Sequence, residues 1–119
     1  MPEKQTTTSR KVNETARAAL ASMLLTEFSD PRIELITVTD VRVSKDRSIA
    51  TVLVTSSPEN YDDTLTGLES AKGRLRSLLG KELGWRVTPD LRFVIDTGVD
   101  HAQEIDALFR GIEQGQKED

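Results

Sequence analysis

The sequence predicts one α+β domain in which helices pack on one face of a three-stranded sheet. Three observations support this class: a helical apolar period near the N-terminus, two adjacent runs rich in Val, Ile and Thr, and a third strand-like run after a further helical stretch. A length of 119 residues fits a single domain. We place that domain at residues 9–112, between a disordered N-terminus at 1–8 and a disordered acidic tail at 113–119.

The first helix is expected over residues 9–28. Ala16, Leu20 and Met23 recur at spacings of three and four, which places them on one face. Ser9 is expected to cap the helix, because its hydroxyl can accept hydrogen bonds from the amides of the first turn. Asp30-Pro31 ends it, since the residue before a proline avoids the α region.

A β-hairpin is expected next, with strands at 34–44 and 48–56 and a short polar loop at 45–47. Ile36 and Val38 alternate in one phase, whereas Val41 and Val43 alternate in the other. A change of phase within one strand indicates a β-bulge, here near residues 39–40. A third strand is expected at 91–96.

A second helical stretch at 60–83 is interrupted by Gly73, and Gly84 is expected as its C-terminal cap. We expect two helices joined at Ala71-Lys72-Gly73, with Gly73 in a conformation that a Cβ atom disfavours. The alternative is that Gly73 is helical and is small only to admit another backbone. With a last helix at 99–112, the order α-β-β-α-α-β is the type II KH topology, followed by a C-terminal helix.

Composition excludes several kinds of chemistry. The chain has no cysteine, which excludes a disulfide scaffold, a zinc ribbon and a cysteine nucleophile. His101 has no second histidine to form a metal site, and Gly80-Lys81 is no phosphate loop because Glu82 stands where Ser or Thr is needed. No apolar run is long enough to span a membrane, and the N-terminus is too polar for a secretory signal. We expect a soluble cytoplasmic protein that is not an enzyme and holds no metal or cofactor.

Charge is distributed unevenly along the chain. The formal net charge is −4, yet residues 70–92 carry six basic and two acidic side chains. On a helical wheel, Arg74 and Lys81 flank the buried stripe on one side and Arg76 on the other. A strip of small residues is expected to face outward between them: Gly73, Ser77 and Gly80. A phosphodiester backbone could approach this strip closely, although a helix–helix contact or a solvated face gives the same pattern.

Residues outside this helical stretch extend or limit the basic region. Arg10 and Arg17 share a face of the first helix, where Glu14 competes for both by ion pairing. Arg86 follows the second helical stretch. Trp85 beside it either stacks on a base or closes the edge of the core.

The sequence resembles the bacterial ribosome-binding factor A family in three runs: DPRIELITVTDVRVSKDRSIATVLV, ESAKGRLRSLLGKEL and TPDLRFVIDTGVDHAQEIDALF. The resemblance covers residues 9–112. Its most specific element is Ala71-Lys72-Gly73, since in this family an Ala-x-Gly kink replaces the GxxG loop of ordinary KH domains. A second match is the PxLxF pattern at residues 89–93. Gly84-Trp85-Arg86 departs from the Leu-Arg that the family often has there.

The resemblance implies a non-catalytic assembly factor that binds the free or immature 30S small ribosomal subunit. It further implies support of late 16S rRNA maturation, including the 5′ end, a link to growth in the cold, and release by an assembly GTPase. We expect a monomer whose rRNA-binding residues are Arg10, Arg17, Lys72, Arg74, Arg76, Lys81 and Arg86. The alternatives are a module that docks a basic protein through its acidic segments, and a small hydrolase with an unrecognised carboxylate site.

Overall fold

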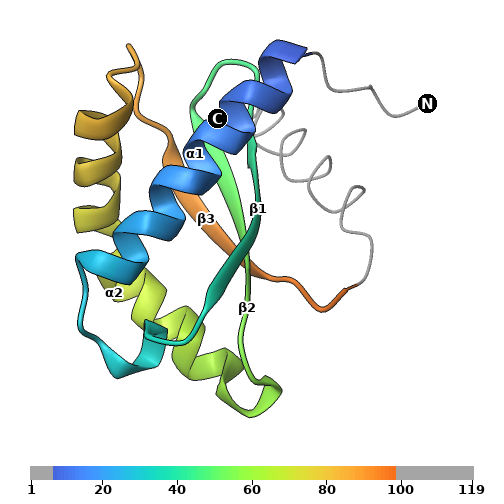
Figure 1. Ribbon diagram of the computed structural model, residues 1–119, viewed down its shortest axis with the longest axis vertical. Coiled ribbons are helices and arrows are strands. Elements are labelled where there is room, and N and C mark those ends of the chain that lie inside the picture. The colour runs from blue at the N-terminus through green and yellow to red at the C-terminus, as the bar shows by residue number, and fades with distance from the viewer. Residues whose placement is uncertain (1–6, 99–119) are drawn as a thin grey trace, which may run out of the picture.

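The structure is a computed structural model that describes residues 7–98 (Figure 1). Its elements are α1 (Thr7–Thr26), η1 (Pro31–Ile33), β1 (Thr37–Val43), β2 (Ile49–Thr55), η2 (Pro58–Asn60), α2 (Tyr61–Leu83) and β3 (Asp90–Ile95). The sheet order is β1-β2-β3, with β1 antiparallel and β3 parallel to β2. The α+β class and the three-stranded sheet are therefore confirmed. The helix expected at 99–112 and the tail at 113–119 lie outside the described residues, as do residues 1–6.

Helix α1 begins at Thr7 and ends at Thr26, two residues before the expected bounds at each end. Ser9 therefore lies within the first turn, and its expected capping role is wrong. Near the C-terminus, the Thr26 hydroxyl donates to the Ser22 carbonyl at 2.9 Å. Such a bond competes with the backbone ladder and favours the end of a helix. Asp30 instead caps η1, where its carboxylate accepts from the Arg32 amide at 2.9 Å.

The expected β-bulge is present in β1. Val38 pairs with Val54 and Asp40 with Leu53, so that Thr39 is the extra residue. The bulge places Val38 and Val41 on the same face, and both are buried. The Thr39 hydroxyl, on the opposite side, donates to the Asp96 carboxylate at 2.7 Å. The phase change in the sequence thus marks the point where the strand is adjusted to keep its valines in the core.

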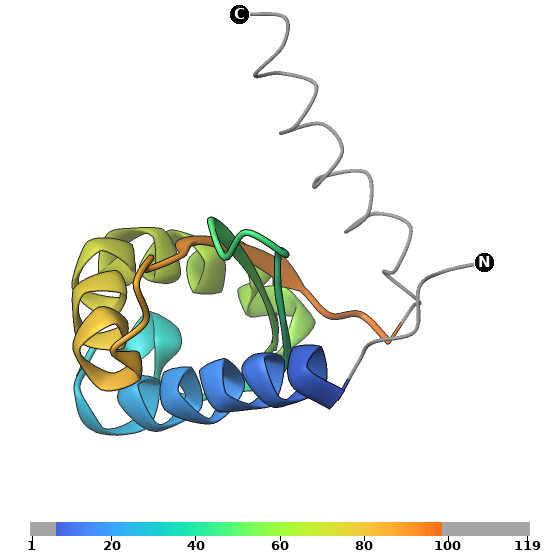
Figure 2. The ribbon, with the colours of Figure 1, turned by 90° about the horizontal axis from the view of Figure 1, so that it is seen from above.

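Helix α2 is one hydrogen-bonded helix of 23 residues and not two. It bends near its middle (Figures 1 and 2), but Gly73 keeps a helical conformation, because the positive-φ glycines among residues 7–98 are Gly84 and Gly98. The expectation of a strained Gly73 is therefore wrong. The buried stripe of Leu68, Leu75 and Leu79 continues through Gly73 without a shift of phase. Gly84, at φ 64°, caps the helix as expected, with its amide 3.1 Å from the Gly80 carbonyl.

The core lies between the sheet and the two helices. Helix α1 packs against β1 and α2 against β3, and the helices also contact each other (Figure 2). The fully buried side chains include Leu20, Leu68, Leu75, Leu79 and Leu91. Gly67 allows η1 to approach α2, since a Cβ atom there would lie 2.8 Å from Cγ2 of Ile33. That distance is well inside van der Waals contact, so this glycine is required by packing.

Two glycine substitutions in α2 should have opposite effects on stability. Gly67→Ala should lower the free energy of unfolding by about 1–3 kcal/mol, because the new methyl group overlaps Ile33. Gly73→Ala should raise it by about 0.4–1 kcal/mol, because the position is helical and no atom lies within 4 Å of the added Cβ. Urea unfolding of both variants measures the two effects. A lower midpoint for Gly73→Ala would contradict the continuous helix.

Candidate nucleic-acid interface

The expected rRNA-binding residues lie on α1, on α2 and in the segment after α2. These residues fall into two groups according to what each side chain contacts. Four side chains are bonded to other residues of the chain: Arg17, Lys72, Arg74 and Arg76. Three have no hydrogen-bond or ion-pair partner within residues 7–98: Arg10, Lys81 and Arg86.

Arg74 links α2 to the C-terminal end of α1. Its Nη1 donates to the Glu27 carbonyl oxygen at 2.6 Å, and its Nη2 lies 3.6 Å from Oε1 of Glu27. The guanidinium also lies 5.0 Å from the centre of the Phe28 ring. A cation at this position interacts favourably with the unpaired carbonyls at the end of α1. Arg74 is exposed as expected, but it also joins two helices.

Arg76 is directed to the other side of α2. Its Nε and Nη2 donate to the carbonyl oxygens of Pro89 and Thr88, at 3.2 Å and 2.9 Å. These bonds fix the segment that leads into β3. Beside them, a Cβ atom on Gly80 would lie 2.8 Å from the Thr88 hydroxyl oxygen, so this glycine faces protein and not solvent. The expected outward strip is therefore wrong at Gly80, while Gly73 and Ser77 are exposed.

Arg17 and Lys72 are both engaged in ion pairs that span one helical turn. The Arg17 guanidinium donates to both carboxylate oxygens of Glu14, at 2.9 Å and 2.5 Å, which is the competition that the sequence indicates. These hydrogen bonds lower the pKa of Glu14 and raise the pKa of Arg17. Lys72 pairs with Glu69 at 2.9 Å. Both cations are partly neutralised before any ligand binds.

A basic end of the molecule is formed by tertiary contacts. Asn13 of α1 accepts from the Val43 amide at 2.9 Å, which fixes the start of α1 beside the β1–β2 loop. The Arg47 guanidinium in that loop lies 4.8 Å from the centre of the Trp85 ring, which fixes the segment after α2 there too. Figure 1 shows the three segments at the upper end of the molecule, with the β1–β2 loop between the start of α1 and the segment after α2. We call this end of the molecule the basic end; the cations on these segments and on the last turn of α2 are Arg10, Lys11, Lys45, Arg47, Lys81 and Arg86.

Sequence reasoning missed three of these cations: Lys11, Lys45 and Arg47. Lys11 follows Arg10 directly in α1, whereas no local pattern marks Lys45 and Arg47, because the hairpin loop brings them to this end. The one acid in that loop, Asp46, is bonded internally to the Ser48 and Ser44 hydroxyls. Those bonds lower the pKa of Asp46, and the bond from the Ser48 hydroxyl has the largest effect. Trp85 packs against the core, and the Arg47 guanidinium lies over its ring. These contacts favour a Trp85 that closes the edge of the core over one that stacks on a base.

Other kinds of site are not found in the described part of the chain. Among residues 7–98, no three His, Cys, Asp or Glu side chains gather closely enough to hold a metal ion. In the same range, no helix is long and apolar enough to cross a membrane. The concentration of cations at one end is therefore the feature that any functional interpretation has to explain.

Comparisons with known proteins agree with this architecture. The family model described as ribosome-binding factor A matches residues 8–109. The chain belongs to the ribosome-binding factor A family. The ribosome-binding factor A of Brevibacillus brevis is 38% identical over 112 residues, which cover 92% of this chain and 93% of that relative. The expectation drawn from the three sequence runs is confirmed.

Two structures of the family share the fold. The crystal structure of ribosome-binding factor A from Thermus thermophilus has a TM-score of 0.68 and 32% identity, covering 73% of this chain and 94% of that chain. The second is a homology model of the Thermus thermophilus factor fitted into the cryo-EM map of a 30S complex. Its TM-score is 0.59 at 34% identity, covering 69% of this chain and 88% of that chain.

Loss of the Arg76 side chain should weaken the fold, whereas loss of the Arg86 side chain should not. Arg76→Ala should lower the free energy of unfolding by about 1–3 kcal/mol, because two carbonyl oxygens lose their hydrogen bonds. Arg86→Ala should change it by less than about 0.5 kcal/mol, because the side chain is exposed. Urea unfolding of both variants compares them. Equal effects would show that the Arg76 bonds do not hold the segment before β3.

Proposed function

We propose that this chain binds the 30S small ribosomal subunit by contacting its 16S rRNA with the basic end. The observation that carries the proposal is the similarity to the Thermus thermophilus factor that has been fitted into the map of a 30S complex. In this proposal the protein acts without catalysis and supports late 16S rRNA maturation, including that of the 5′ end. It acts as a monomer in the cytoplasm, contributes to growth in the cold, and is released by an assembly GTPase.

The distribution of charge supports RNA as the partner, despite the acidic net charge. Binding to phosphate depends on local potential more than on the sum over the chain. The basic end presents Arg10, Lys81 and Arg86 without carboxylate partners in the described residues. We assign direct phosphate contacts to these three. Arg17, Lys72, Arg74 and Arg76 then add to the potential while they also hold the fold.

The continuous α2 bears on how RNA would be recognised. A GxxG loop in a KH domain clamps about four nucleotides of single-stranded backbone. Here Ala71, Lys72 and Gly73 lie within one helix, so no such loop separates two helices. Trp85, moreover, is packed at the edge of the core. We therefore propose a KH-like domain that recognises the shape of folded rRNA through charges at one end, with little base stacking.

A second candidate function rests on the acidic part of the chain. Residues 48–71 contain no lysine or arginine. Glu59 is exposed in η2, and Asp62 and Asp63 are exposed in the first turn of α2. A protein–protein module would dock a basic partner on such a surface. The two candidates differ in salt dependence, because release of counterions from phosphate gives a steep slope of affinity against salt.

Removal of two cations from the basic end should reduce the salt dependence of 30S binding. In a Lys81→Ala and Arg86→Ala double variant, the slope of log affinity against log salt should shrink by about 0.7–0.9 for each phosphate that is no longer neutralised. Co-sedimentation with purified 30S subunits over a range of KCl concentrations measures this slope. Lys81→Arg with Arg86→Lys is the matched control, because it keeps both charges. An unchanged slope in the alanine variant would contradict the assignment.

A further inference from the structure

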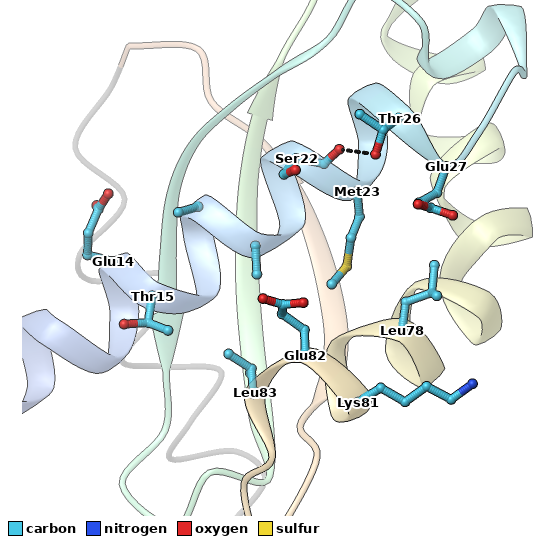
Figure 3. A pocket seen from close by; sticks show the side chains of 12 residues that line it. Glu14, Thr15, Ser22, Met23, Thr26, Glu27, Leu78, Lys81, Glu82 and Leu83 are labelled. Atoms are coloured by element: carbon cyan, nitrogen blue, oxygen red, sulfur yellow. Dashed lines mark hydrogen bonds between the residues drawn. The ribbon is translucent and has the colours of Figure 1, made fainter.

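A groove of about 750 Å³ runs between α1 and the C-terminal half of α2 (Figure 3). Its apolar lining consists of Ala18, Ala19, Met23, Leu78 and Leu83. The middle of the α1 side is built from the small residues Ala18, Ala19 and Ser22, which leaves space between the helices.

The charges of the groove differ from those of the basic end. Three glutamates and one lysine line it. Glu14 and Glu27 are bonded to Arg17 and Arg74, so their charge is partly compensated. Glu82 has no such partner within residues 7–98. In Figure 3 its carboxylate lies between the helices and points toward α1, whereas Lys81 extends away.

We propose that this groove docks a basic amphipathic helix of a small-subunit protein. An amphipathic helix binds a groove by placing its apolar face on the floor, here on Met23 and Leu78. A lysine or arginine of the same helix would pair with Glu82. RNA is a poor occupant, because three glutamates line the groove against one lysine and repel phosphate. Proteins that neutralise rRNA are rich in such cations.

The groove and the basic end are neighbours, since Lys81 lies in the last turn of α2 and also lines the groove. One molecule would therefore contact rRNA phosphate with one surface and a basic protein with the next. The inference that the partner is a small-subunit protein rests on the proposed function, 30S binding. The inference that the groove binds a basic helix rests only on the groove's own lining, so the groove and the proposed function can be tested separately.

A photo-crosslinking residue at Ala18 tests the inference on the full-length protein. Ala18 is exposed and lines the groove. The probes are purified 30S subunits and, separately, the RNA-free protein fraction extracted from them. Crosslinks from position 18 to a Lys- or Arg-rich segment of a subunit protein are expected with both probes. The same group at Thr66, which is exposed on the first half of α2, should give no such product.

Charge reversal in the groove provides the matched comparison. Glu82→Lys should lower the yield of the position-18 protein crosslink about tenfold, because an opposite-charge pair becomes a like-charge pair. Glu34→Lys makes the same change on an exposed carboxylate outside the groove and should leave the yield within about twofold. Thermal melts check that each variant is folded. Glu82→Gln, which should give a smaller loss, replaces Glu82→Lys if the lysine variant does not fold.

The outcomes separate the groove from the proposed function. Co-sedimentation of the unmodified protein with 30S subunits, measured in parallel, reports the proposed function alone. The docking inference would be overturned if position 18 crosslinks only to rRNA. It would also be overturned if position 18 crosslinks to no protein with either probe. An equal response to Glu82→Lys and Glu34→Lys would overturn it as well.

Discussion

Burial of one leucine stripe on α2 is the constraint on which the other features depend. Leu68, Leu75 and Leu79 are fully buried in the core, and their spacing fixes the rotation of α2 about its axis. That rotation directs Arg74 toward α1 and Arg76 toward the segment before β3. It also places Glu82 in the groove beside α1. The positions of the charged side chains are thus consequences of apolar packing.

The same packing explains why the chain can be acidic and still carry a basic end. The β1–β2 loop, the start of α1 and the segment after α2 lie at the same end of the molecule because the sheet and α2 both end there (Figure 1). Two polar contacts, Asn13 to Val43 and Arg47 to Trp85, hold the three segments together. The acids of residues 48–71 lie in other elements. A net charge of −4 is therefore compatible with a strongly cationic surface at one end.

Much of the fold could be predicted from the sequence, because it depends on local periodicity. The phase change in β1 predicted the bulge, and the cap at Gly84 followed from the end of the leucine period. Gly73 was misjudged because a glycine in a helix is unfavourable by only about 1 kcal/mol relative to alanine. Burial of leucines on both sides of it exceeds that penalty, so the helix continues.

The candidate site was predictable only in part. The Glu14–Arg17 pair is local and could be read from the spacing of the two residues. The carbonyl partners of Arg74 and Arg76 belong to segments 47 and 12–13 residues away, and no pattern in α2 reveals them. Arg47 was missed for the same reason, since its place beside Trp85 depends on how the hairpin meets α2.

Directed hydroxyl-radical probing of 16S rRNA tests the central claim most directly. Because the chain has no cysteine, one introduced cysteine can carry a tethered iron chelate at a unique position. The account predicts strong cleavage of 16S rRNA in 30S complexes of Lys45→Cys, at the basic end, and little cleavage with Glu59→Cys, in η2 just before α2. Cleavage mainly from position 59, or from neither position in complexes that co-sediment, would contradict it.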